Sequence, residues 1–371
     1  MQLPWGGELS GFPYLLLGGW GGLFGIAAYC ALVEKRRIPL VGDIFLAVSL
    51  VLFAGLRGNS LDYDEYVLMF EAVRDATQET IIERALLGKD LIFGSLLIFV
   101  SNTGLGVFAV FLCAAILSVG FKVAAFRKAF GSSLLALFVF FCTYYFLHDF
   151  TQIRAAIAIS LCFCALVAVA QEHRTQYLLM SLAAIGFHAQ AALVVACTAP
   201  LFFGGKERFI LMVINSTIII IATPILMNIV ILFDNRPGIA ESVEVISFNG
   251  ALSAIFNVGL LLSIFFSCHK NFRNSMEREI SVASIILVVS GLGFLLFTFS
   301  SSVTMAWRGA EMFMSFGVFV VVAALRGTAK PTVFLLSIAY CLFNITLLVR
   351  GPLLVEYKFS ENLGAYCASF W

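Results

Sequence analysis

Apolar runs long enough to cross a lipid bilayer recur along almost the whole chain, and this feature limits the fold more than any other. A transmembrane helix needs about 20 predominantly apolar residues. Runs near that length predict about twelve spans, at residues 11–32, 39–56, 105–124, 133–149, 153–170, 177–188, 189–203, 209–233, 248–267, 279–299, 309–325 and 331–349. The sequence therefore predicts an all-α polytopic integral membrane protein, with residues 1–371 forming a single transmembrane domain.

The composition excludes several other classes of protein. Hydrophobic residues make up 61% of the chain and charged residues 12%, so no stretch is polar enough for a separate soluble domain. The net charge of +1 disfavours a nucleic-acid-binding protein, which would be strongly basic. The sequence contains no GxGxxG or Walker-type phosphate loop, which disfavours an ATP-driven pump.

Three of the apolar stretches are too short to cross a bilayer alone. Residues 177–188 and 189–203 resemble a broken hairpin centred on His188. The stretch 91–103 is also short, and we interpret it as a re-entrant or interfacial helix.

Basic residues are concentrated in alternate loops, which predicts the orientation of the chain. These loops hold 14 of the 23 basic residues and six of the 22 acidic ones. The basic residues are Lys35, Arg36, Arg37, Lys122, Arg127, Lys128, Arg174, Lys206, Arg208, Lys270, Arg273, Arg278, Arg326 and Lys330. Because loops rich in Lys and Arg stay in the cytoplasm, the opposite face and both termini should lie outside.

The predicted external face carries the longer polar segments. Residues 57–90 form a first external loop, and residues 234–247 (DNRPGIAESVEVIS) form a second. Within the first loop, Tyr66, Phe70 and Val73 alternate with charged residues, which predicts an amphipathic helix in contact with membrane lipids. A solvated lid without chemistry is the alternative interpretation.

Charged and titratable residues collect at the external ends of the predicted spans. They are Arg57, Asp62, His148, Asp149, Arg154, His188, Arg308 and Arg350. Guanidinium, imidazole and carboxylate groups together suit a phosphate or diphosphate at the headgroup level, because Arg offers a planar bidentate fork. The alternatives are ordinary ones: an Arg at a span end often snorkels to lipid, and a His or Asp often has a structural hydrogen bond or helix cap. The spacing of the histidines does not indicate a metal site.

Four short stretches resemble motifs of the EpsG-type branch of the Wzy polysaccharide polymerases. Arg57-Gly58, followed by Asp62-Tyr63 and Tyr66, is similar to the family's Arg-Gly and Asp-Tyr-x-x-Tyr element. The other three stretches are Gln152-Ile153-Arg154-Ala155-Ala156-Ile157-Ala158, Phe187-His188-Ala189-Gln190-Ala191-Ala192-Leu193 and Glu356-Tyr357-Lys358-Phe359. The resemblance runs from about residue 40 to residue 203 and continues more weakly to the C-terminus.

This resemblance implies a glycosyltransferase-C-like fold and a polymerase of oligosaccharide units linked to undecaprenyl diphosphate. The enzyme would work at the outer face of the bacterial inner membrane and produce O-antigen or exopolysaccharide for lipopolysaccharide or related surface polymers. Its partners would be a lipid-linked donor and acceptor, with a chain-length regulator as a further candidate and no nucleic acid. We expect catalysis without a metal or another cofactor.

The candidate residues divide by chemistry. Arg154, Arg308 and Arg57 are expected to bind the diphosphate, because the leaving group is anionic. His188 is the first candidate for the base that activates the acceptor hydroxyl, and Asp62 is the second. The candidate sugar-binding residues are Tyr63, Tyr66, Gln152 and Asp149.

Two other classes of membrane protein remain open from the sequence. A flippase or transporter of lipid-linked sugars should have ionisable residues along a path through the membrane, or two related halves. A membrane O-acyltransferase acting on polysaccharide also uses an intramembrane His, but needs a cytoplasmic route for its acyl donor. Neither internal duplication nor a long cytoplasmic loop is visible in the sequence.

Overall fold

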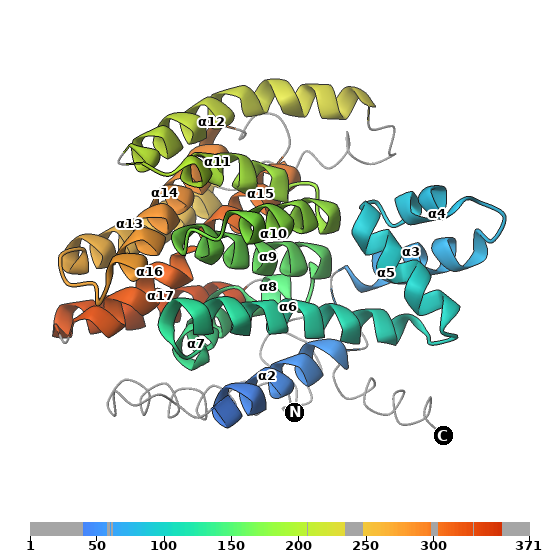
Figure 1. The fold of residues 1–371 in the computed structure, drawn as a ribbon, viewed down its shortest axis with the longest axis horizontal. Helices are drawn as coiled ribbons and strands as arrows, with labels where there is room; N and C mark the ends of the chain where they lie inside the picture. The colour runs from blue at the N-terminus through green and yellow to red at the C-terminus, as the bar shows by residue number, and fades with distance from the viewer. Residues whose placement is uncertain are drawn as a thin grey trace. The chain divides into compact units, whose positions relative to one another are not determined.

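The computed structural model describes residues 40–57, 60, 62–205, 207–233, 248–297, 303–328 and 330–350. These residues form helices joined by short turns, without a strand among them (Figure 1). The all-α prediction is therefore confirmed for this part of the chain. The predicted span 11–32, the second external loop 234–247 and the motif at 356–359 lie outside the described residues.

The chain divides into two compact units. The first contains Met1–Cys164, Leu182–Ala189 and Asn344–Trp371, and the second contains Ala165–Ser181 and Gln190–Phe343. The division into one transmembrane domain with two external loops stays a prediction.

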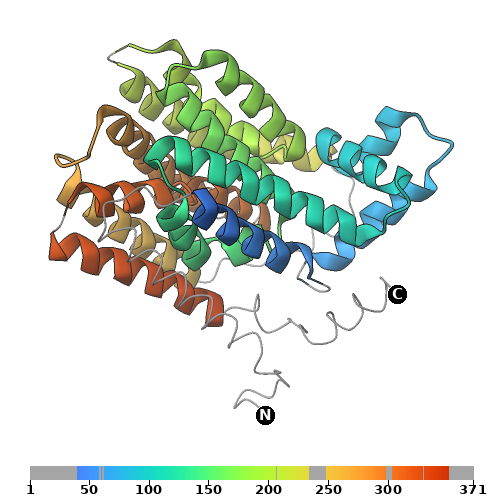
Figure 2. The ribbon, with the colours of Figure 1, turned by 60° about the horizontal axis from the view of Figure 1, so that its bottom comes forward.

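The first unit is built on a pair of antiparallel helices, α2 (Leu40–Gly55) and α6 (Val107–Phe130), which lie side by side in Figures 1 and 2. At one end of the pair, Gly55 lies directly against Leu112. At the other end, the buried carboxylate of Asp43 accepts a hydrogen bond from Arg127. The remaining helices of this unit include α7 (Leu134–Thr143), α8 (Tyr145–His148) and the first part of α9 (Ile153–Ala170).

A group of three helices precedes α6: α3 (Tyr63–Asp75), α4 (Ile81–Leu87) and α5 (Leu91–Asn102). Helix α3 buries Tyr66, Met69, Phe70 and Val73, whose spacing of three and four residues places them on one face. The amphipathic helix expected in this segment is therefore present, and it begins three residues before Tyr66, but its apolar face packs inside the protein rather than against lipid.

Helices α4 and α5 meet at a bend of 104°, which makes them either a broken span or a re-entrant loop. A capping box between Thr80 and Glu83 fixes the start of α4. Lys89 adopts a left-handed conformation, with φ of 69°, just after the end of α4. Gly94 allows the two helices to touch, because a Cβ there would overlap the carbonyl oxygen of Ala85. The short helix expected at 91–103 is thus present as α5.

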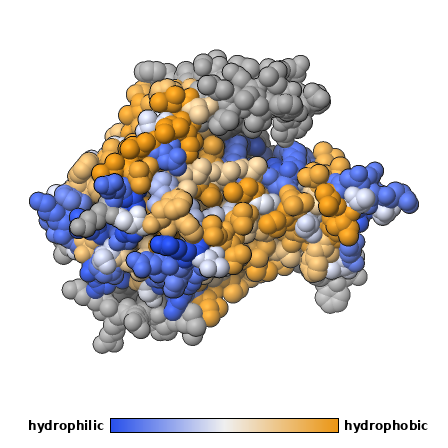
Figure 3. Space-filling model, turned by 45° about the horizontal axis from the view of Figure 1, so that its top comes forward, coloured by the Kyte–Doolittle hydropathy of each residue, from blue (hydrophilic) through white to orange (hydrophobic). Residues whose placement is uncertain are grey.

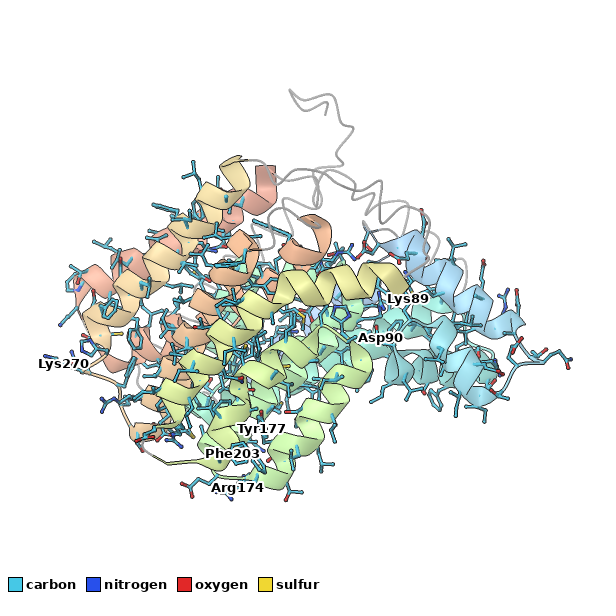
Figure 4. The ribbon with its side chains drawn as sticks, turned by 90° about the horizontal axis from the view of Figure 1, so that it is seen from above. Lys89, Asp90, Arg174, Tyr177, Phe203 and Lys270 are labelled. Atoms are coloured by element: carbon cyan, nitrogen blue, oxygen red, sulfur yellow. The ribbon has the colours of Figure 1, made fainter. Side chains whose placement is uncertain are left out.

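The second unit contains α11 (Ala191–Phe203), α12 (Arg208–Phe233), α13 (Phe248–Cys268), α14 (Ser275–Phe297), α15 (Val303–Met314), α16 (Gly317–Gly327) and most of α17 (Pro331–Arg350). Helix α14 packs against α12, α13, α15 and α16. The first part of α10 (Arg174–Phe187) also belongs here, and Figure 4 shows its Arg174 and Tyr177 near Phe203 of α11.

Among the described residues, five helices are long and apolar enough to cross a membrane, or six if the bent pair α4 and α5 counts as one span. The five are Val107–Phe130, Ile153–Ala170, Gly250–Cys268, Ser275–Phe297 and Trp307–Gly327. Hydrophobic side chains cover broad areas of the face drawn in Figure 3, as expected of a surface in contact with lipid. The protein is therefore a polytopic membrane protein, but twelve spans are not established.

Two expectations about individual segments are wrong. Residues 133–149 do not form one helix, because α7 ends at Thr143 and the single turn α8 follows after Tyr144. Lys122 does not lie in a loop, because α6 continues to Phe130 and buries this side chain.

Candidate functional site

The carboxylate of Asp90 joins two of the predicted site residues. Asp90 occupies the N-cap position of α5, but its side chain makes no cap hydrogen bond to that helix. Its Oδ2 instead accepts a hydrogen bond from Arg154 Nη1 at 2.5 Å and lies 3.7 Å from His188 Nδ1. Its Oδ1 accepts the backbone N–H of Ala189 at 3.0 Å. We call Asp90, Arg154, His188 and Tyr66 the Asp90 cluster.

The local sequence explains how these residues come together. The bend between α4 and α5 lies just before the start of α5, where Figure 4 shows Lys89 and Asp90 next to each other. Helix α10 approaches α5 closely at Gly186, where a Cβ would overlap the side chain of Ile92. His188 follows directly after α10, so the close approach brings its imidazole to Asp90.

Arg154 lies at the second position of α9 and is largely buried, with 12% of its side chain exposed. One nitrogen is bound to Asp90, and the guanidinium lies 5.9 Å from the centre of the Phe93 ring. Its Nε is buried without a hydrogen-bond partner among the described residues. Arg154 therefore keeps donor capacity for a further acceptor.

Tyr66 of α3 completes the cluster. It is buried, and its hydroxyl lies within side-chain hydrogen-bonding reach of Arg154. Burial raises the pKa of the Tyr66 phenol above its ordinary value, although the positive charge of Arg154 opposes the shift. The phenol is therefore neutral at physiological pH and keeps a proton to donate.

Asp149 is part of a different and more deeply buried group. Lys122 Nζ lies 3.0 Å from both carboxylate oxygens of Asp149, and Ser118 donates a hydrogen bond to Oδ1 at 2.5 Å. The two charged side chains are 1% and 0% exposed. We call Lys122, Asp149 and Ser118 the buried ion-pair network. Because its carboxylate is bound there, Asp149 does not present it to a sugar in this structure.

Arg57 lies between α2 and the turn that precedes α9. Its Nη1 donates hydrogen bonds to the backbone oxygens of Asp149 at 2.7 Å and Ala54 at 3.2 Å. The guanidinium lies 4.5 Å from the centre of the Phe111 ring, on which Tyr63 also stacks. Arg57 is 2% exposed, so a diphosphate could reach it only if the surrounding side chains moved.

The other predicted site residues have separate positions. Asp62 is buried at the N-cap position of α3, and its side chain makes no cap hydrogen bond there. Gln152 precedes α9, within hydrogen-bonding reach of His148. Arg308 lies in α15 of the second unit and is partly buried. Its expected approach to Arg154 and His188 stays a prediction.

Sequence reasoning did not single out Asp90. In the sequence it appears only as the last residue of the external segment 57–90. A signal was nevertheless present, because an acidic residue directly precedes the short apolar stretch that was interpreted as re-entrant. A charge at such a break is usually placed for a specific partner.

No group of three or more His, Cys, Asp or Glu side chains in the described part of the chain has the arrangement of a metal site. Metal-independent catalysis stays a prediction. The chemistry available in the Asp90 cluster is that of a guanidinium, an imidazole, a carboxylate and a neutral phenol.

Comparison with known proteins identifies one family. The model of the EpsG family matches residues 42–359, which include the Asp90 cluster and the buried ion-pair network. Searches of the curated proteins and of the solved structures return no match.

Proposed function

The chain belongs to the EpsG family, a polysaccharide-biosynthesis family, and we propose that it joins oligosaccharide units carried on undecaprenyl diphosphate into a longer polymer. The growing chain is the donor, and a sugar hydroxyl on a second lipid-linked unit is the acceptor. The hydroxyl oxygen bonds to the anomeric carbon of the donor, and the bond from that carbon to the lipid diphosphate breaks. Lipid diphosphate leaves as the anion, and the hydroxyl proton passes to a base.

The observation that carries this proposal is the convergence of Arg154 and His188 on one carboxylate. They lie at the start of α9 and just after α10, and each approaches Asp90. The reaction needs a positive group for the leaving diphosphate and a base for the acceptor hydroxyl. The Asp90 cluster supplies both side by side.

Arg154 is the proposed diphosphate-binding residue. Its guanidinium has an unused buried N–H beside the bond to Asp90, which supports binding of a second anion. A donor fixed in this way typically contributes about 3–4 kcal/mol to stabilisation of the transition state. Arg57 and Arg308 remain candidates for the same role.

His188 is the proposed base. Its Nδ1 faces Asp90, which favours the tautomer that carries the proton on this nitrogen. Nε2 is then the nitrogen that accepts the proton of the acceptor hydroxyl. Asp62 remains the second candidate, and Tyr63, Tyr66 and Gln152 remain candidates for sugar binding.

The proposal includes the location of the reaction. We place the Asp90 cluster at the outer face of the bacterial inner membrane, where the lipid-linked units are displayed. The excess of basic residues in the alternate loops supports this orientation, although Lys122 no longer counts among them because it lies buried within α6. The product class, O-antigen or exopolysaccharide, is part of the same proposal.

The test is polymerisation by the purified protein in liposomes with a synthetic lipid-linked repeat unit, followed by gel analysis. We expect Arg154→Lys and His188→Gln to abolish the ladder, because a lysine cannot provide the bidentate fork and an amide is not a base. Arg74→Lys is the matched control, since Arg74 is exposed on α3. A normal ladder in both site variants would refute the site.

The same assay separates polymerisation from the rival functions. Liposomes that carry substrate only in the outer leaflet need no transport step, so a ladder formed there excludes a flippase as the source of activity. Labelled acyl donor added to the same liposomes would identify an acyltransferase if label appeared on the sugar.

A further inference from the structure

The buried ion-pair network lies where a charge is least expected, inside a helix long enough to span the membrane. Lys122 is in α6, fifteen residues after its start and eight before its end, or about 22 Å and about 12 Å along the axis. Charges at such a depth are costly, and they usually have a specific partner and a functional role.

The network satisfies the hydrogen-bonding groups of both ions. Lys122 contacts both oxygens of Asp149 and the hydroxyl of Ser118, and its ammonium lies 4.6 Å from the centre of the Phe140 ring. The hydroxyl of Ser160 on α9 lies 3.1 Å from that of Ser118. Asp149 is thereby tied to α6 from the turn that connects α8 with α9.

The same residue holds Arg57 through its backbone. The carbonyl oxygen of Asp149 accepts Arg57 Nη1 at 2.7 Å, while its carboxylate is bound to Lys122. Arg154 follows five residues later, at the second position of α9. The position of one turn therefore determines where two of the proposed diphosphate-binding guanidinium groups lie.

We propose that the ion pair of Lys122 and Asp149 is a positioning pair for the proposed reaction, which sets Arg57 and the start of α9 relative to the substrate. Neither residue touches the substrate; both act through the two arginines. This inference rests on the proposed function, and it gives Asp149 a different role from the sugar contact expected from the sequence.

The test compares the neutral double variant Lys122→Met/Asp149→Asn with the wild type in the liposome assay. A variant without either charge avoids the unpaired buried ion that each single substitution would leave. We expect a folded protein by gel filtration and thermal melting, with kcat lowered at least tenfold and KM changed less than threefold. A shifted guanidinium loses contact mainly with the charge that develops in the transition state.

Lys128→Met is the matched control, because Lys128 is exposed on the same helix and its loss should leave kcat unchanged. If the double variant does not fold, Ser118→Ala decides the question. It removes the hydroxyl that donates to Asp149, accepts from Lys122 and contacts Ser160, but it keeps the ion pair. We expect about a threefold fall in kcat in a protein that stays folded by gel filtration.

The outcomes separate this inference from the proposed function. If the double variant folds and has wild-type kcat, the positioning role is overturned. If the double variant does not fold, wild-type kcat in Ser118→Ala overturns it instead. If Arg154→Lys polymerises normally, the proposed site fails instead. Loss of activity in Arg154→Lys together with wild-type kcat in the double variant refutes the positioning pair alone.

Discussion

Replacement of Asp90 by Asn would test whether one carboxylate organises the candidate site. The amide has nearly the same size, and its oxygen can still accept the N–H of Ala189, which bonds to Oδ1 at 3.0 Å. It removes the negative charge that faces Arg154 at 2.5 Å and His188 at 3.7 Å. The substitution therefore removes the charge of the side chain while leaving its shape nearly unchanged.

The expected cost follows from the burial of the pair. The side chains of Asp90 and Arg154 are only 7% and 12% exposed, so the arginine would be left with little water to compensate its charge. Breaking a buried ion pair typically costs about 3–5 kcal/mol. We expect about 3 kcal/mol, the lower end, because the amide oxygen keeps one hydrogen bond.

Two measurements on the purified protein check this expectation. Chemical denaturation should show the loss of stability, and the liposome assay should show the loss of polymer. Asp64→Asn is the matched control, because Asp64 is exposed on α3, and it should leave both measurements unchanged. An Asp90→Asn variant as stable and as active as the wild type would show that the carboxylate does not organise the site.

Four further substitutions have expected outcomes that follow from the structure. Gly94→Ala should lower the melting temperature, because its Cβ would overlap the carbonyl oxygen of Ala85. Gly120→Ala is its control; a Cβ there meets open space within α6, so the change should be neutral or stabilising by up to about 1 kcal/mol. Equal effects of the two substitutions would argue against the close contact at Gly94. Thr80→Ala should lower the free energy of unfolding by about 1 kcal/mol in denaturation experiments, because it removes the capping box of α4. An unchanged free energy of unfolding would contradict a role for that cap. Tyr66→Phe should lower polymerisation a few-fold, because it removes the hydroxyl near Arg154. Folding raises the pKa of the Tyr66 phenol, so the contribution of Tyr66 to stability should be full below pH 10 and fall above it. An absorbance change at 295 nm assigned to Tyr66 below pH 10 would contradict this.

The sequence predicted best the helices in which apolar residues run almost without interruption from one end to the other. Helix α9 begins and ends at the predicted residues 153 and 170, because all of its residues except Arg154 and Ser160 are apolar and polar residues flank it. The break at His188 was also predicted, because each neighbouring apolar stretch is too short to cross a bilayer.

The errors arose where a distant partner determines the structure. Hydropathy along residues 133–149 does not reveal the break at Tyr144. Hydropathy averaged along the sequence also placed Lys122 in a loop, because its partner Asp149 lies 27 residues later and gives no signal near Lys122. Such pairings depend on the packing of helices, which the periodicity of a single segment does not report.

The candidate site was predicted in part for the same reason. Arg154 and His188 were identified by their chemistry and their positions at the ends of apolar segments, and each approaches the carboxylate of Asp90 in the structure. The carboxylate that joins them was not identified, because Asp90 reaches them only through the 104° bend between α4 and α5. At the bend the two helices approach so closely that a Cβ on Gly94 would overlap the carbonyl oxygen of Ala85.

The separation of Lys122 from Asp149 also has a consequence for biosynthesis. When α6 leaves the ribosome, its lysine emerges before its counter-ion, because the two lie 27 residues apart in the sequence. A lone lysine at the centre of a membrane helix costs about 2.5–3.5 kcal/mol on insertion scales, and Lys122, about 12 Å from the end of α6, should cost less. Nascent chains that stop short of residue 149 should therefore integrate α6 less efficiently than chains that extend beyond it, and α6 and the turn before α9 would have to settle in the membrane as one folding unit.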